Sequence, residues 1–300
     1  MFDLAVIGHY TIDRIIVGEG EPRPTLGGPP TYTSIAARRM GATVTVISKV
    51  GKDFPDEYIA WLSRNGIDLT GLARVDTPTT RFTSKFENEE RVLQLKSVCS
   101  PILPEDIPVD LKTKCIHLGP VAREIPAETV SHVAKRTEVV SLDPQGFVRR
   151  FDREGNVLDQ ERLDVTVLRR IDILKASEGE LKIAMGIDDL WKAMEAATKF
   201  GPNAVIVTKG VKGALMLYGR TRYEIPAYAP RLIIDPTGAG DAFIGAFMAE
   251  YVKGKDPSWC AAVGSATSSF VVEGIGPSSF GSKDDVLKRA ERIFQLIKKL

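Results

Sequence analysis

The chain has 300 residues, 43% of them hydrophobic, and its 40 Lys and Arg residues almost balance its 39 Asp and Glu residues. That length and hydrophobic content suffice for a large core, in one large α/β domain or in two smaller ones. A formal charge of +1 gives no sign of binding to nucleic acid or to an acidic membrane, so we expect neither partner. No apolar run is long enough to cross a bilayer, and the N-terminus lacks the order of a signal peptide, so we expect a cytoplasmic protein.

The cysteines and histidines are widely spaced and form neither a CxxC pair nor a metal-ligand pattern. We expect buried structural thiols and structural imidazoles at these positions, which are Cys99, Cys115, Cys260, His9, His117 and His132. The structural interpretation is least secure for His9, because this residue directly follows the first apolar run of strand length, at residues 2–8.

Apolar runs of strand length alternate with helical patterns along most of the chain. This alternation predicts a mostly parallel sheet with helices on both faces. We expect strands at residues 2–8, 43–50, 114–118, 139–142, 172–176, 204–209, 214–218, 222–225 and 232–235. We expect helices at residues 31–40, 56–65, 127–135, 188–200, 239–253, 258–272 and 284–299.

Residues 79–98 have a different pattern. Two alternating segments, 81–86 and 91–95, flank a polar turn and predict an antiparallel hairpin. A short extended piece at 14–17 precedes a Gly- and Pro-rich stretch. Together these pieces predict a small sheet that stands off the main domain as a lid, over approximately residues 14–26 and 79–98. Exposed strand edges on such a lid could be covered by pairing two chains into a homodimer.

The most informative segment lies at residues 232–243, where an apolar run ending at Asp235 leads through a Gly-Ala-Gly turn into a long helix. The first N–H groups of a helix have no internal partner, and the helix dipole is positive there, so the turn can form an anion hole. Gly238 and Gly240 would permit unusual dihedral angles and a close approach of ligand to the backbone. Asp241, in the first turn, could accept the proton of an attacking hydroxyl. The alternative is a purely structural role, in which the glycines form only a turn and Asp241 is an ordinary acid at the start of a helix.

The stretch from Asp235 to Asp241, DPTGAGD, resembles the C-terminal signature of the ribokinase-like (PfkB) sugar kinases. Further similar stretches cover nearly the whole chain: the glycine pair at 27–28, VGKDF at 50–54, GID at 66–68 and TKGVKGA at 208–214. The resemblance implies a single domain over residues 1–300, with a doubly wound, mostly parallel sheet flanked by helices and a small β-sheet lid.

The resemblance also implies roles for individual residues. Asp241 would be the catalytic base, and Gly238, Ala239 and Gly240 would form the anion hole. The nucleotide-binding residues that it implies are Ser177, Thr208, Gly210 and Gly213. Mg²⁺ would accompany ATP, and some family members also need a monovalent cation such as K⁺ near the loop of Asp235 and the loop at 274–278.

The chain departs from the family pattern at two positions. Many members carry Asn-x-x-Glu where this chain has Ser177 and Glu180, and a Ser hydroxyl can still join a water network. We therefore expect Glu180 to reach the metal through water, with altered metal affinity, and Ser177 to cap the next helix as well. Tyr32 stands where ribose-type members commonly have Asn, which changes the acceptor pocket and argues against plain ribokinase activity.

The acceptor site is expected where the first strand ends and where the strand at 139–142 ends, because ligands of open α/β sheets bind there. Carboxylates suit this site because they accept hydrogen bonds from vicinal diols. The residues expected to bind the acceptor are Asp13, Gly27, Gly28, Tyr32, Gln145 and Arg149. The run DPQGFVR at 143–149, together with Lys-Ala-Ser at 175–177, is similar to the inositol kinase branch of the family.

The sequence therefore predicts an ATP-dependent phosphotransferase that acts on an alcohol group of a small polyol or sugar, with an inositol-type acceptor favoured. A nucleoside kinase is the main alternative, because archaeal-type nucleoside kinases share the style of SSFVVE at 268–273. Another sugar kinase, acting on a hexose or a sugar phosphate, also remains open. A ligand-binding sensor without catalysis is a further alternative, which only the departure at Ser177 supports.

Overall fold

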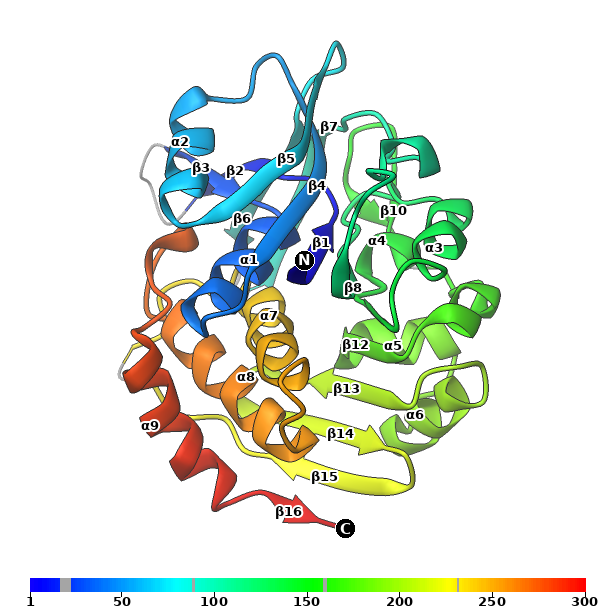
Figure 1. The fold of residues 1–300 in the computed structure, drawn as a ribbon, viewed down its shortest axis with the longest axis vertical. Helices are drawn as coiled ribbons and strands as arrows, with labels where there is room; N and C mark the ends of the chain where they lie inside the picture. The colour runs from blue at the N-terminus through cyan, green and yellow to red at the C-terminus, as the bar shows by residue number, and fades with distance from the viewer. Residues whose placement is uncertain (17–22, 88–89, 159–160, 231) are drawn as a thin grey trace.

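The computed structural model describes residues 1–16, 23–87, 90–158, 161–230 and 232–300. Within these ranges, ten strands form a large sheet in the order β16-β15-β14-β13-β12-β9-β8-β1-β4-β5, and four form a small sheet in the order β3-β2-β6-β7 (Figure 1). The strands of the large sheet are β1 (Phe2–Ile7), β4 (Val44–Gly51), β5 (Ile67–Val75), β8 (Thr113–Leu118), β9 (Val139–Leu142), β12 (Ile173–Ser177), β13 (Ala204–Thr208), β14 (Ala214–Tyr218), β15 (Thr221–Ile225) and β16 (Lys298–Lys299). Those of the small sheet are β2 (Thr11–Ile16), β3 (Arg23–Gly27), β6 (Thr80–Glu87) and β7 (Glu90–Ser97), and β10 (Arg150–Phe151) pairs with β11 (Val157–Leu158).

The large sheet is parallel from β13 to β5 and antiparallel from β13 to β16. Its central strands are short apolar runs that are buried on both faces, as in AVIVT of β13, which is typical of a parallel sheet covered by helices on both sides. The predicted mostly parallel sheet is therefore confirmed.

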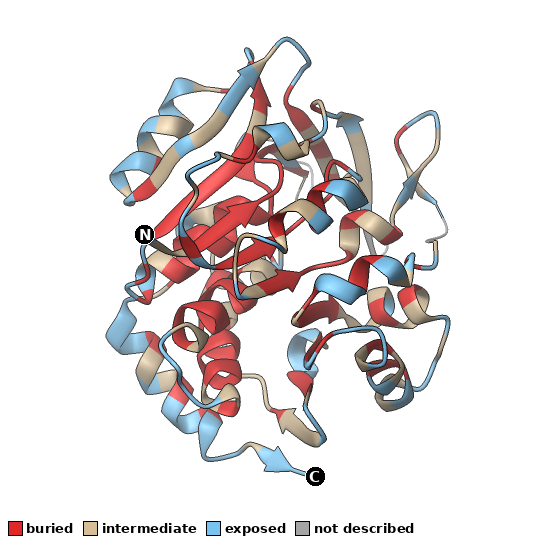
Figure 2. Ribbon diagram, turned by 45° about the vertical axis from the view of Figure 1, so that its right-hand side comes forward, coloured by how far each residue is buried: buried red, intermediate tan, exposed pale blue. Residues whose placement is uncertain are grey.

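Helices cover both faces of the large sheet (Figure 1). Leu4, Val6 and Met248 belong to the apolar core on one face, and Ile116, Leu142 and Leu181 belong to the core on the other. Figure 2 shows that the buried residues gather in the central strands and in the helices packed on them. The helices are α1 (Pro29–Arg39), α2 (Asp56–Arg64), α3 (Ala127–Val133), α4 (Gln145–Val148), α5 (Glu178–Met185), α6 (Leu190–Thr198), α7 (Ala239–Tyr251), α8 (Pro257–Val271) and α9 (Lys283–Phe294).

The small sheet contains the predicted hairpin, with β6 and β7 antiparallel, while β2 and β6 run parallel. One expectation about it is corrected: strand β2 begins at Thr11, because it pairs with β6 from its first residue. Residues 23–27, most of which fall within the predicted lid segment 14–26, form strand β3. The tip of the hairpin at 88–89 and the predicted extended residue 17 lie outside the described residues.

The small sheet joins the rest of the molecule at four places that meet at His9. His9 itself lies between β1 and β2. Its Nε2–H donates to the carbonyl of Ser100, which follows β7, at 3.1 Å. Its Nδ1 accepts from the hydroxyl of Thr80, at the start of β6, at 2.9 Å. Gly28, between β3 and α1, lies so close that a β-carbon there would be 2.3 Å from the His9 carbonyl oxygen. Burial lowers the pKa of His9, so the imidazole is neutral and serves a structural role, as predicted.

Two further expectations differ from the structure, and one strand was missed. The apolar run 232–235 is not a strand, because the side chains of 232–234 are exposed and the N–H of Ile234 instead donates to the carbonyl of Val272, at the end of α8. The last helix ends at Phe294 rather than 299, and residues 298–299 pair with β15 as β16. Strand β5 was not predicted.

All three cysteines are buried and free, as expected. No helix among the described residues is long and apolar enough to cross a membrane.

Candidate active site

Helix α7 begins at a tight turn that depends on Gly238. This residue is the N-cap, with φ 76° and ψ −2°, a left-handed conformation that residues with a β-carbon adopt only at a cost. A β-carbon there would also lie 2.3 Å from ring atoms of Tyr32, and this tyrosine is buried. The predicted backbone requirement at Gly238 is therefore confirmed, and Tyr32 is the wall behind the turn.

The unusual dihedral angle predicted for Gly240 is not observed, while the predicted close approach of a ligand to its backbone stays a prediction. This residue lies inside α7, and its φ is not in the positive range, so an unusual dihedral angle does not explain the glycine. A β-carbon at this position would lie 2.6 Å from the Nζ of Lys175. The missing side chain at Gly240 thus makes room for a buried ammonium directly beneath the first turn of α7.

Asp241 is the third residue of α7 and lies in an unusual electrostatic environment. Burial raises the pKa of its carboxyl to about 7, against the attraction of Lys175 and Arg149, while the negative charges of Asp143 and Glu180 add to the rise. A base works best when its pKa is near the working pH. The carboxyl of Asp241 can therefore take up and release a proton at neutral pH.

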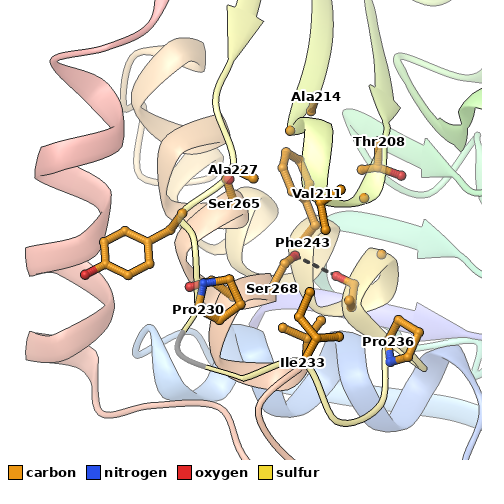
Figure 3. Close-up of a pocket in the computed structure, with 17 residues that line it drawn as sticks. Thr208, Val211, Ala214, Ala227, Pro230, Ile233, Pro236, Phe243, Ser265 and Ser268 are labelled. Atoms are coloured by element: carbon orange, nitrogen blue, oxygen red, sulfur yellow. Dashed lines mark hydrogen bonds between the residues drawn. The ribbon is translucent and has the colours of Figure 1, made fainter.

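An apolar cavity of about 260 Å³ opens on one side of this turn (Figure 3). All three residues predicted from TKGVKGA to contact the nucleotide line it, namely Thr208, Gly210 and Gly213. Figure 3 shows side chains from β13, β14, the 227–236 segment, α7 and α8 surrounding the space. The hydroxyl of Ser268 donates to the carbonyl of Ala239 at 2.7 Å, the dashed line in Figure 3, and so fixes the first turn of α7 against α8.

A smaller, polar cavity of about 90 Å³ lies on the other side of the turn. It contains five of the six residues predicted to bind the acceptor, which are Asp13, Gly28, Tyr32, Gln145 and Arg149. The other residues that line it are Thr11, Pro29, Phe82, Leu93, Val121, Thr237, Gly238 and Asp241. The small sheet, α1, the segment after β9 and the start of α7 therefore enclose one space between them.

The first turn of α7 separates the two cavities. Ala239 and Gly240 face the apolar cavity, whereas Gly238 and Asp241 face the polar one. The N–H groups of the first helical residues have no acceptor within the helix, although that of Ala239 donates to Pro236 at 3.2 Å. A phosphoryl group bound at this turn would lie between a ligand in the apolar cavity and a ligand in the polar cavity.

Three predicted site residues lie outside both cavities. Gly27 lies against Asp13, since a β-carbon at 27 would be 2.1 Å from Asp13 Oδ2, and so leaves room for that carboxylate. Ser177 and Glu180 form a capping box at the start of α5: Ser177 Oγ accepts from the N–H of Glu180 at 3.3 Å, and Glu180 Oε2 accepts from the N–H of Ser177 at 2.8 Å. The predicted capping role of Ser177 is confirmed.

Sequence reasoning missed the pair formed by Lys175 and Asp143. Lys175 Nζ donates to Asp143 Oδ2 at 2.6 Å, and both side chains are almost fully buried. A lysine inside the apolar strand ILKAS was an available signal, because Lys is almost never buried without a partner. The apolar wall of the larger cavity, including Tyr228 and Phe243, carries no comparable signal, since apolar residues at these places could equally belong to the core.

The comparisons with known proteins agree with this geometry. The sequence matches the pfkB family carbohydrate kinases over residues 1–101 and 116–284. A cytidine kinase of Thermococcus kodakarensis is 28% identical over 269 residues, covering 88% of this chain and 94% of its own. An inositol 3-kinase of Arabidopsis thaliana is 28% identical over 304 residues, covering 96% of this chain and 80% of its own.

Solved structures share the fold. A pyrophosphate-dependent kinase of the ribokinase family, complexed with a pyrophosphate analog and myo-inositol, superposes with a TM-score of 0.81 at 21% identity, covering 95% of this chain and 99% of its own. A structure from E. coli in complex with ATP and Mg²⁺ gives 0.80 at 20% identity, covering 97% and 100%. The chain belongs to the pfkB family of carbohydrate kinases. It is a kinase with the ribokinase fold, as the sequence predicted.

Proposed function

We propose that this kinase transfers the γ-phosphoryl group of ATP to a hydroxyl of a small polyol, with an inositol-type acceptor favoured. One observation carries the proposal: the first turn of α7 lies between an apolar cavity and a polar cavity, with Asp241 on the polar side. A nucleoside fits an apolar cavity, and its phosphates would extend toward the helix N-terminus, where backbone N–H groups bind anions. The acceptor hydroxyl would then approach from the polar side.

The composition of the polar cavity supports a polyol acceptor. Asp13 lies on the small sheet, and its Oδ1 accepts from the hydroxyl of Thr11 at 2.7 Å, while Gln145 and Arg149 follow β9. Two carboxylates, an amide and a guanidinium can bind several hydroxyl groups at once. The polar cavity has about a third of the volume of the apolar one, which favours an acceptor smaller than a nucleoside. A nucleoside acceptor remains the second candidate, because the cytidine kinase is among the relatives.

The proposed reaction follows from these positions. The acceptor oxygen attacks the γ-phosphorus, its proton passes to an Oδ of Asp241, and the bond from phosphorus to the bridging oxygen breaks so that ADP leaves with the electron pair. Gly238, Ala239 and Gly240 would stabilise the charge on the phosphoryl oxygens. The small sheet would act as the lid that the sequence predicted at approximately residues 14–26 and 79–98. Its closure over the polar cavity would exclude water that competes for the phosphoryl group.

Two cations belong to the proposal. Mg²⁺ would bind chiefly to the ATP phosphates, with Glu180 reached through water, because Mg²⁺ commonly combines phosphates, waters and one or two carboxylates; the described residues contain no cluster of His, Cys, Asp and Glu that could hold a metal unaided. A monovalent cation such as K⁺ fits near Asp235. The Oδ2 of this buried carboxylate has no hydrogen-bond partner among the described residues, and an unpaired buried charge needs a counterion.

Pairing of two chains through the small sheet also remains a proposal. Strand β7 is at one edge of that sheet, and the segment 154–156 contacts this edge at Gln94 and Leu95. An edge with unpaired backbone groups is a template for another strand. Light scattering of the purified chain would decide between one copy and two.

The test is ATP consumption with Mg²⁺ across myo-inositol, ribose, fructose, adenosine, guanosine and cytidine, with K⁺ present or replaced by Na⁺. A signal on myo-inositol alone supports the proposal, and a signal on nucleosides alone overturns the acceptor while keeping the roles of Asp241 and the turn. Inorganic pyrophosphate replaces ATP in a parallel series, because a donor without a nucleoside would leave the apolar cavity empty. Binding of ATP without turnover on any acceptor would favour the sensor alternative.

A further inference from the structure

Lys175 occupies a position where strands seldom carry charge. It is 4% exposed and lies on β12 between Leu174 and Ala176, which are fully buried. Strands β9 and β12 are neighbours in the large sheet, and this arrangement brings Asp143, the residue after β9, beside Lys175. The 2.6 Å contact between Nζ and Oδ2 gives each buried charge a partner.

The Lys175 ammonium also lies beneath the helix start that separates the two cavities. The β-carbon that Gly240 lacks would be 2.6 Å from Nζ and 3.4 Å from Cε. Helix α7 has glycine at this position, although alanine is the better helix former by roughly 1 kcal/mol. Glycine at 240 therefore leaves space for the Lys175 ammonium under the first turn, next in sequence to Asp241.

Charged groups of both signs lie near Asp241. The negative groups near it are Asp143 and Glu180, and Asp13 lines the same cavity; the positive groups are Lys175 and Arg149. Burial and the two nearby carboxylates raise the pKa of Asp241, and Lys175 opposes this rise more strongly than Arg149 does. His117 is buried and neutral, since burial and the nearby Lys175 ammonium lower its pKa to about 3.

Asp143 extends the effect of Lys175 to the acceptor side. While its Oδ2 accepts from Lys175, its Oδ1 accepts from the N–H of Gln145 at 3.1 Å. Gln145 begins the short segment that places Arg149 in the polar cavity. One ion pair thus supports both the base and the segment that would contact the acceptor.

We propose that Lys175 is a positioning residue of the transfer site: held by Asp143 beneath the first turn of α7, its ammonium keeps the Asp241 carboxylate ionised and fixes the segment that begins at Gln145. The role rests on the proposed phosphoryl transfer and deepens it. Asp241 must be ionised to accept a proton. Without the ammonium, Asp143 and Asp241 would be two buried negative charges that disfavour each other.

The test compares Lys175→Met, Lys175→Arg and Asp143→Asn through kcat/KM for the accepted polyol between about pH 5.5 and 9. The acid limb of the parent enzyme should fall near pH 7, the pKa of Asp241. Lys175→Met should move this limb to higher pH by about 1 unit and Asp143→Asn should move it to lower pH, whereas Lys175→Arg should leave it near the parent value. Loss of activity with the limb at an unchanged pH in both charge-removing variants would overturn the proposal.

A second measurement needs neither substrate nor turnover. Each variant is paired with its Asp241→Asn partner, and the pH at which the two melting temperatures diverge reports the ionisation of Asp241. This pH should rise in Lys175→Met and fall in Asp143→Asn; the same pH in all backgrounds would overturn the role of Lys175. Failure of the parent enzyme to phosphorylate any acceptor would instead overturn the proposed function, and the melting comparison would still decide the role of Lys175.

Discussion

Replacing Asp241 by Asn should sharply lower turnover and stabilise the protein at the same time. The matched control is Asp285→Asn, because Asp285 is the third residue of α9 just as Asp241 is the third residue of α7. Both acids are in the first turn of a helix, where a negative charge is normally favourable. Asp285 is exposed and accepts from Ser282, whereas Asp241 is buried against other charges.

The expected loss of activity is that of a missing general base. Removing such a group costs about 10²- to 10⁴-fold in rate, or roughly 3–5 kcal/mol of barrier. Binding of ATP should be kept, since Asp241 faces the polar cavity rather than the apolar one. Asp285→Asn should leave turnover unchanged, because Asp285 lines neither cavity.

The expected gain in stability follows from the raised pKa of Asp241. Between about pH 4 and pH 7 the folded protein holds a proton that the unfolded chain releases, so the free energy of unfolding falls as the pH rises through this window. Asn cannot ionise, and the variant therefore escapes this loss, which is on the order of 2–4 kcal/mol at pH 8. The hydrogen bond from Ser282 lowers the pKa of Asp285, so Asp285→Asn should destabilise the protein at neutral pH and lose this effect in acid.

The assays are steady-state turnover with ATP and thermal unfolding at pH 8 and near pH 4. Parent-like turnover in Asp241→Asn would refute its assignment as the base. A melting temperature at pH 8 below that of the parent would refute the reasoning that the buried carboxylate is destabilised. At pH 8 the melting temperature should rise in Asp241→Asn and fall in Asp285→Asn. Such opposite changes would show that the effect at Asp241 comes from its buried surroundings and not from removing an acid from the first turn of a helix.

Three further predictions concern other parts of the site. Gly238→Ala should cost roughly 2–4 kcal/mol in urea unfolding, because left-handed strain adds to a collision with Tyr32; Gly254→Ala, with φ 74° and open space around it, should cost only the strain, about 1–2 kcal/mol. Ser177→Ala should lower the free energy of unfolding by about 1 kcal/mol through loss of the cap, whereas Ser177→Asn should retain the cap, and a magnesium titration should show a higher affinity in the Asn variant. Asp13→Asn should lower kcat/KM for the acceptor about 10- to 100-fold while the KM for ATP stays constant, and an equal change in both constants would contradict its place in the polar cavity.

The parts of the fold that sequence predicted well are those fixed by local pattern. Strands such as β13 are short apolar runs between turn residues, and the start of α7 is defined by glycines within a few residues. The run LIID at 232–235 has the same apolar character, yet it is not a strand, and it lies beside the apolar cavity with Ile234 bonded to the end of α8. Strand β5 has few buried residues, as an edge strand does. An apolar run does not show whether a segment pairs with a strand, and a strand with few buried residues shows no clear alternation, so local pattern failed at both places.

The candidate site was predicted where residues act through a local motif and missed where they act through the order of the strands. Asp241 and Gly238 could be assigned from one heptapeptide. Lys175 and Asp143 are 32 residues apart in sequence, and only the adjacency of β9 and β12 brings them together. The need for glycine at 240 likewise became clear only once Lys175 was seen beneath it.

The meeting of four chain passages at His9 constrains how the small sheet can move. Asp13 on β2, Phe82 on β6 and Leu93 on β7 all line the polar cavity, and their strands are bonded into one sheet. If the small sheet closes as the proposed lid, passages that converge on one imidazole would favour a rotation about that point over a sliding movement. Such a rotation would move these three side chains together, so one rotation angle would set their separation from Asp241.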